Sequence, residues 1–204
     1  MRVFRRLVPW LALPLLAIGG WQAGHGAFLH GKAWLAQELL RDAWARSRGD
    51  APPARPWPWA DTWPVARIEV ARLGVDEIVL AGGSGRTLAF GPGHVDGTAA
   101  PGQPGNSVIG GHRDTHFRFL RDLVPGDTVV VTTVERRRIA YRVVDRQVVR
   151  DGAAGIRLDV DGTWLTLATC YPFDSLVPGG PLRYVVTARA MDPALAEAPA
   201  VNDF

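Results

Sequence analysis

From Val65 onward, short runs of apolar residues alternate with polar ones in the two-residue period of β-strands. Turn residues such as Gly, Pro and Asp separate the runs, and residues 115–123 have the pattern of one or two helical turns. We therefore expect strands at residues 65–70, 78–80, 107–109, 128–133, 139–149, 163–169 and 183–190. Many short strands with turns between them predict a mostly β domain, either a barrel or a sandwich.

The N-terminal part of the chain has a different pattern. Residues 7–31 contain no Asp, Glu, Lys or Arg, a length that can cross roughly 30 Å of hydrocarbon as a helix. Positive charge at Arg2, Arg5 and Arg6 favours a cytoplasmic N-terminus. A cleaved secretory signal is the alternative, but no convincing small-x-small cleavage site precedes the next charged stretch. We expect residues 1–31 to be a signal-anchor that crosses the cytoplasmic (inner) membrane once.

The remaining chain divides by composition. Residues 32–64 combine an amphipathic helix over 33–48 with a stiff Pro/Trp-rich linker. Residues 65–192 hold the β pattern, and the Ala/Pro-rich residues 193–204 are expected to be a loose tail. If the anchor is not cleaved, the β domain lies on the extracytoplasmic, periplasmic side.

Composition narrows the function. The chain has 204 residues, 47% of them hydrophobic, so it can bury a core of ordinary domain size. The net charge is only +3, and the arginines are scattered among acids, which argues against a nucleic-acid partner. The Arg136–Arg138 run reads as a solvated hairpin tip.

Three residues at strand ends could do chemistry. Cys170 is the only cysteine, so it cannot form an intramolecular disulfide. A thiolate is a nucleophile, and a nearby imidazole such as His112 can act as acid and base. Arg183 cannot serve as a base, but it can provide a fixed positive charge. A buried cysteine and a structural histidine are the plainer alternatives.

A metal site is the other chemistry that these residues permit. His116 follows His112 by four residues, so on a helix the two could share a face and bind zinc with Cys170. No HExxH motif or second cysteine supports such a site. We expect no metal and no cofactor.

Local motifs resemble one family. Residues Thr166–Cys170 fit the TLxTC signature of sortases, and Gly105–Asp114 resembles the histidine motif of that family. Residues Pro181–Val186 resemble the strand that carries its arginine, and Phe90–His94 resembles the approach to its histidine. The resemblance covers roughly residues 64–190 of the chain.

The resemblance implies a closed eight-stranded β-barrel with short helices, preceded by an N-terminal membrane helix. The continuation Cys170–Phe173 is similar to that of class D/E members and of Gram-negative members of the family. Leu182 departs from the pattern, because many class D/E members carry an acid at this position.

The resemblance also implies the activity of a membrane-anchored cysteine transpeptidase. Such an enzyme cuts an LPxTG-like sorting signal of a secreted protein between Thr and Gly, and an amine acceptor at the cell envelope receives the product. Cys170 would form the thioester, His112 would move protons, and Arg183 would stabilise the oxyanion. Thr169 and His94 are candidates for substrate binding. The alternatives are a thiol protease that hydrolyses the same signal and a non-catalytic, membrane-tethered β-barrel that binds a partner.

Overall fold

The computed structural model describes residues 2–47, 52–151, 156–175, 177 and 179–191, with side chains omitted for residues 2–17 and Leu29. The chain forms two compact units, Met1–Leu39 and Leu40–Phe204. The domain boundaries expected from composition therefore stay predictions.

The first unit belongs to helix α1, which spans Arg2–Arg46. The charge-free stretch and the helix expected over residues 33–48 are thus parts of one continuous helix. Within the described part of the chain, no helix is both long enough and apolar enough to cross a membrane. Most of the apolar residues of the expected anchor precede residue 18, where side chains lie outside the described part.

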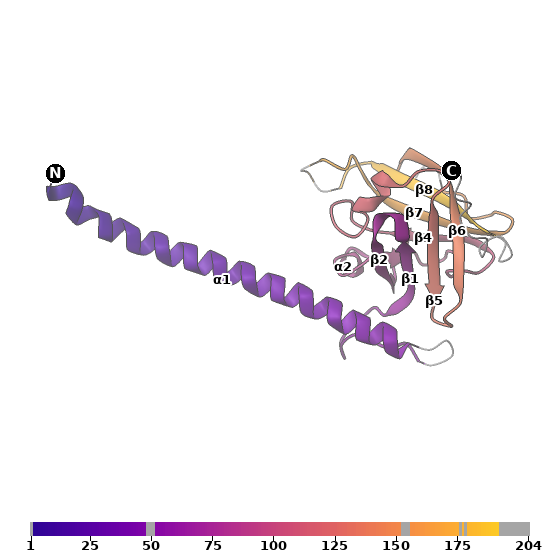
Figure 1. The fold of residues 1–204 in the computed structure, drawn as a ribbon, viewed down its shortest axis with the longest axis horizontal. Helices are drawn as coiled ribbons and strands as arrows, with labels where there is room; N and C mark the ends of the chain where they lie inside the picture. Colours follow the sequence, from indigo (N-terminus) through magenta and orange to yellow (C-terminus); the bar gives the residue numbers. More distant parts are fainter. Residues whose placement is uncertain (1, 48–51, 152–155, 176, 178, 192–204) are drawn as a thin grey trace, which may run out of the picture. The chain divides into compact units, whose positions relative to one another are not determined.

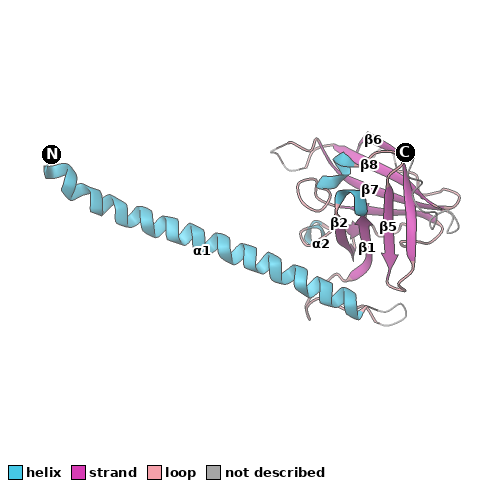
Figure 2. Cartoon of the chain, viewed as in Figure 1, coloured by secondary structure: helices cyan, strands magenta, loops and turns pink. Residues whose placement is uncertain are grey.

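The second unit is a barrel closed by eight strands (Figures 1 and 2). The strands are β1 Pro64–Val70, β2 Val75–Ala81, β3 Gly93–His94, β4 Gly105–Gly110, β5 Thr128–Thr133, β6 Arg138–Arg150, β7 Thr163–Tyr171 and β8 Leu182–Ala190. Around the barrel their order is β1-β2-β3-β4-β7-β8-β6-β5. Three short helices connect them: η1 Ala71–Leu73, α2 Gly85–Leu88 and η2 Arg118–Asp122. The closed barrel resolves the choice that the alternation left open.

Neighbouring strands run antiparallel except at two places, where β2 pairs with β3 and β4 pairs with β7 in parallel. All seven predicted strands are present, and η2 falls within the predicted helical turns. The strand that the sequence missed is β3, which has only two residues and therefore no readable alternation.

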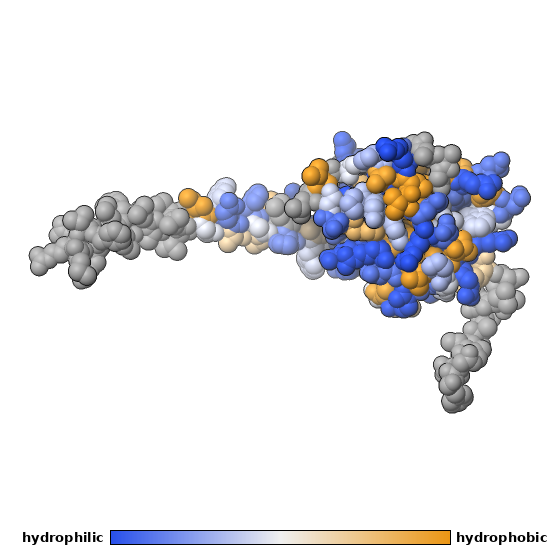
Figure 3. Space-filling view, turned by 90° about the horizontal axis from the view of Figure 1, so that it is seen from above, coloured by the Kyte–Doolittle hydropathy of each residue, from blue (hydrophilic) through white to orange (hydrophobic). Residues whose placement is uncertain are grey.

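The barrel core follows from the alternation. In β1 every second residue is buried, including Ala66, Ile68 and Val70. Full burial of an aliphatic side chain of this size contributes about 1.5–3 kcal/mol. Tyr141 of β6 lies in the same core, and burial raises the pKa of its hydroxyl to about 12. On the face seen in Figure 3, hydrophobic side chains lie among hydrophilic ones.

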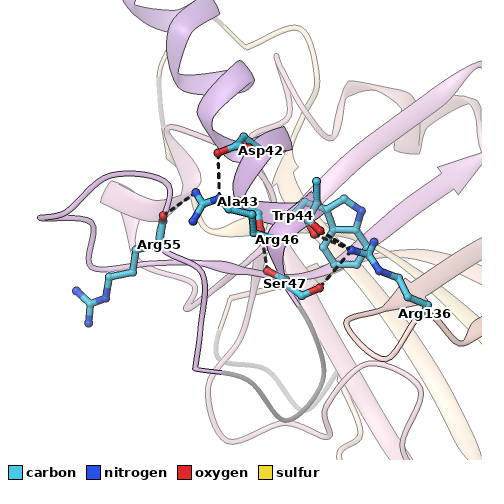
Figure 4. A network of polar contacts seen from close by, with 8 residues as sticks. Asp42, Ala43, Trp44, Arg46, Ser47, Arg55 and Arg136 are labelled. Atoms are coloured by element: carbon cyan, nitrogen blue, oxygen red, sulfur yellow. Dashed lines mark hydrogen bonds and ion pairs between the residues drawn. The ribbon is translucent and has the colours of Figure 1, made fainter.

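The last turn of α1 belongs to the barrel unit and is bound there by the turn between β5 and β6. Arg136 of this turn donates to the carbonyl oxygens of Trp44, Ala45 and Ser47 at 2.9, 3.3 and 3.2 Å (Figure 4). Its guanidinium also lies 4.6 Å from the centre of the Trp44 ring. Arg136 is exposed, as expected for this turn, and its guanidinium in addition contacts the helix end, because the last carbonyls of a helix lack partners within the helix.

Candidate active site

Cys170 and Arg183 are brought together by the pairing of β7 with β8. The register places Cys170 directly opposite Arg183. Directly opposed residues of an antiparallel pair project from the same face, with Cβ atoms roughly 4.5–5.5 Å apart. Cys170 is a free, half-buried thiol. The nucleophile candidate and the fixed charge candidate therefore emerge side by side.

His112 reaches the same region through the parallel pairing of β4 with β7. Gly110 lies opposite Ala168, and the Gly111 amide donates to the Ala168 carbonyl at 3.1 Å. The buried Thr169 hydroxyl donates to the Gly111 carbonyl at 2.6 Å. The residue before His112 is thus bonded to the residue before Cys170. His112 itself is exposed.

The turn after His112 depends on a glycine. The Phe117 amide donates to the His112 carbonyl at 3.0 Å, and the Phe117 ring is fully buried. A Cβ on Gly111 would lie 2.6 Å from Cγ of that ring. Such an approach is excluded for any other residue unless the ring moves. The buried ring therefore fixes the backbone from which His112 projects.

Arg183 is oriented by three hydrogen bonds. Its guanidinium donates to the Asp151 carboxylate at 2.6 Å and to the carbonyls of Gly180 and Leu182 at 2.6 and 3.0 Å. The Asp151 amide in turn donates to Pro181 at 2.6 Å, which extends the pairing of β6 with β8. The acid next to Arg183 is thus the residue that directly follows the neighbouring strand β6. Asp151 was not predicted from the sequence, because only the pairing of β6 with β8 connects it to the site.

An aromatic cluster follows the thiol. The rings of Tyr171 and Tyr184 are stacked with centroids 6.2 Å apart, and Phe173 meets Tyr184 edge-on at 5.1 Å. Edge-on and offset aromatic pairs contribute about 0.5–1.5 kcal/mol beyond their buried area. The cluster ties the first residues after Cys170 to β8.

The two candidates for substrate binding, Thr169 and His94, have structural partners. Thr169 uses its hydroxyl for the buried bond to Gly111. The His94 imidazole meets the Ala99 carbonyl at 2.8 Å and the Thr98 hydroxyl at 3.0 Å. His94 also lines a cavity of about 260 Å³ together with Trp63 and other residues. A role of Thr169 or His94 in substrate binding stays a prediction.

His116 does not join the site as a metal ligand would. Its Nδ1 lies 2.9 Å from the Glu77 carboxylate of β2. Among the residues that the structure describes, no three His, Cys, Asp or Glu side chains are grouped as a metal ion would require. The arrangement at Cys170 suits thiol chemistry assisted by His112 and Arg183.

Comparison with known proteins gives one consistent answer. A sequence model of the sortase domain matches residues 68–191, more than half of the chain. Sortase D of Bacillus subtilis (strain 168) is 31% identical over 123 residues, which cover 60% of this chain and 61% of the relative. The chain thus spans less than two thirds of that relative's length.

Solved structures agree. A sortase D5 transpeptidase from Clostridium perfringens has a TM-score of 0.55 at 27% identity, covering 63% of this chain and 79% of that chain. Sortase C-1 from Actinomyces oris has a TM-score of 0.56 at 28% identity, covering 77% and 99% respectively. Sortase A from Corynebacterium diphtheriae, at 23% identity and a TM-score of 0.59 with coverage of 87% and 86%, shares the fold.

Proposed function

This chain belongs to the sortase family, and we propose that it is a cysteine transpeptidase in which Cys170 is the nucleophile. The observation that carries the proposal is the register of β7, which sets Cys170 opposite Arg183 while Ala168 and Thr169 bind the residue before His112. Likeness to sortases D is consistent with a class D/E-like member. Membership of the Gram-negative branch stays a prediction.

The first half-reaction forms a thioester. The Cys170 thiolate attacks the carbonyl carbon of the scissile peptide bond, and the carbonyl oxygen becomes an oxyanion. The His112 imidazolium then gives its proton to the departing nitrogen as the C–N bond breaks. The C-terminal fragment leaves with a free amine, and the remaining protein is held on Cys170.

The second half-reaction transfers that protein. An acceptor amine attacks the thioester carbonyl, and neutral His112 takes the proton that the amine loses. The C–S bond breaks and the Cys170 thiolate is restored. The new amide bond replaces the one that was cut, so no cofactor is consumed.

Arg183 serves the oxyanion in both steps. Its described contacts occupy three of the five N–H groups of a guanidinium. The other two can donate to a developing oxyanion or to a substrate carbonyl. Because Asp151 and two carbonyls already orient the group, little reorganisation is needed when charge develops.

We assign as substrate a secreted protein that ends in an LPxTG-like sorting signal, cut between Thr and Gly. The test incubates the purified full-length chain with a peptide carrying this signal, with and without an oligoglycine amine. Mass spectrometry should find an amine-linked product and an acyl adduct on Cys170. Hydrolysis alone, even at high amine concentration, would replace this proposal with a thiol protease. Absence of both product and adduct would favour a binding module.

We also assign residues 1–31 to an anchor in the inner membrane, with the barrel on the periplasmic side. The charge-free stretch supports this assignment. Cells that express the full chain should retain it in membranes washed with alkaline carbonate, whereas a Leu15→Arg, Leu16→Arg variant should be released. Release of the unchanged chain by the wash would overturn the anchor.

A further inference from the structure

Arg113, the residue after His112, is a buried arginine. Only 7% of it is exposed. Its described partners are three backbone carbonyls: Nη2 donates to Val177 at 2.6 Å and to Ser175 at 2.9 Å, and Nη1 donates to Gly179 at 3.5 Å. Arginine is rarely buried unless its charge is satisfied. The function of this side chain should therefore follow from the segment to which these three carbonyls belong.

All three acceptors lie in one connection between β7 and β8, residues 172–181, called here the 172–181 loop. The loop begins two residues after Cys170 and ends two residues before Arg183. A peptide whose scissile carbonyl lies between the thiol and the guanidinium must therefore bind next to this loop. The loop borders the site because its two ends are held next to Cys170 and Arg183.

The bonds to Arg113 connect this loop to a different part of the barrel. Arg113 projects from the segment after β4, which also carries His112. Hydrogen bonds from a charged donor are stronger than those between neutral groups. One side chain thus holds the loop that begins beside Cys170 against the segment that carries His112.

We propose that Arg113 is a positioning residue that holds the 172–181 loop in the conformation that receives the sorting peptide. The inference rests on the proposed function for its substrate. Arg113 touches neither the thiol nor the reacting carbonyl in this role. It acts by fixing the loop beside the thiol in advance, so that the peptide does not have to order the loop on binding.

Loss of the Arg113 bonds should change KM for the peptide more than kcat. In Arg113→Gln, we expect KM for the peptide to rise about tenfold, because the bound peptide must now order the loop. We expect kcat at saturating peptide to stay within about threefold of the unchanged enzyme. Arg113→Lys should restore part of the change, since an ammonium can donate to the carbonyls but lacks the planar fork.

Arg136 provides a matched control. It also donates to three backbone carbonyls, those of Trp44, Ala45 and Ser47. Arg136→Gln should leave KM unchanged. Circular dichroism with thermal unfolding counts the folded fraction of molecules in every variant. A loss of kcat in proportion to that count, with KM unchanged in Arg113→Gln, would reduce Arg113 to a structural residue and overturn the proposal.

A second variant perturbs the loop from its own side. Gly179 has a φ of +81°, and a Cβ placed on it would meet nothing within 4 Å. Gly179→Ala therefore strains only the loop backbone and should raise KM in the same direction, by about threefold. Gly74→Ala, at φ +63° and equally open, is the control. An unchanged KM in Gly179→Ala would contradict the proposed role of the loop.

Hydrogen exchange separates this inference from the proposed function. The amides of this loop, at Phe173, Asp174, Ser175, Val177, Gly179 and Gly180, should exchange faster in Arg113→Gln than in the unchanged chain, without any peptide present. Unchanged exchange would overturn the inference even if the enzyme is active. Faster exchange in a chain that acts on no sorting peptide would uphold the contact and refute the proposed function instead.

Discussion

The two ends of the barrel carry arginines with the same pattern of bonds and different surroundings. Arg113 binds three carbonyls of the 172–181 loop beside Cys170. Arg136 binds three carbonyls at the end of α1. The pairing of β6 with β8 shows that these are opposite ends of the barrel. Near the end of β6, Val149 pairs with Arg183 at the start of β8. The start of β6, which follows Arg136 in the chain, pairs with the end of β8.

The difference lies in what each arginine completes. The acceptors of Arg136 are carbonyls that a helix end leaves unpaired, and a cation there also interacts favourably with the helix dipole. The Trp44 ring adds a cation–π contact. The acceptors of Arg113 belong to a loop that borders the thiol. The same hydrogen-bond pattern therefore predicts a role in stability at one end and in substrate binding at the other.

The largest effect is expected at the nucleophile. Cys170→Ala should lower turnover by about 10³-fold or more, because no thioester can form. Cys170→Ser should lose nearly as much, since a hydroxyl is far less acidic than a thiol. Product formation is measured by mass spectrometry, and thermal unfolding checks that the fold is kept. Substantial turnover in Cys170→Ala would show that Cys170 is not the nucleophile and that the active site lies elsewhere.

Arg183 comes next. Arg183→Lys should lower kcat by about 100-fold, because lysine cannot bind Asp151, the loop carbonyls and an oxyanion with one planar group. Arg189→Lys, on the same strand but near its other end, is the control and should be near normal. Steady-state kinetics with the sorting peptide measure both. Equal activity of the two variants would show that Arg183 does not stabilise the oxyanion.

Asp151 should have a smaller effect. Asp151→Asn keeps an oxygen acceptor for Arg183 but removes the charge, so we expect kcat/KM to fall about fivefold. The Asp151 side chain is 60% exposed, so solvent screens the pair and little stability should be lost. Asp145→Asn, within the strand β6 that Asp151 follows, is the control. A fall as large as that of Arg183→Lys would mean that Asp151 holds the arginine in place almost alone.

The comparison of the two ends also shows what the sequence could reveal. Alternation predicted seven strands because half-buried strands must alternate, and β1 does so at every residue. The three candidate site residues were predicted because each stands at a strand end inside a recognisable motif. The register then places Cys170 opposite Arg183, while the catalytic roles of the three residues stay predictions.

What the sequence left out depends on pairing between distant strands. Asp151 reaches Arg183 only because β6 lies beside β8, and no local pattern encodes that neighbour. The contacts of Arg113 and Arg136 were missed for a related reason. Their partners are backbone carbonyls, which every residue carries, so nothing in the sequence marks them as acceptors.

Arg136 should have the smallest effect on activity and a clear effect on stability. Arg136→Gln should leave kcat and KM unchanged and lower the free energy of unfolding by about 1–2 kcal/mol, through lost carbonyl bonds and the lost contact with Trp44. Because Arg136 has a φ of +64°, glutamine keeps the same backbone strain and isolates the guanidinium. Arg136→Gly loses the same bonds but relieves that strain, by about 1 kcal/mol. Denaturant unfolding should therefore find glycine less destabilising than glutamine. A reversed order would mean that the backbone at this turn, rather than the arginine side chain, holds the end of α1.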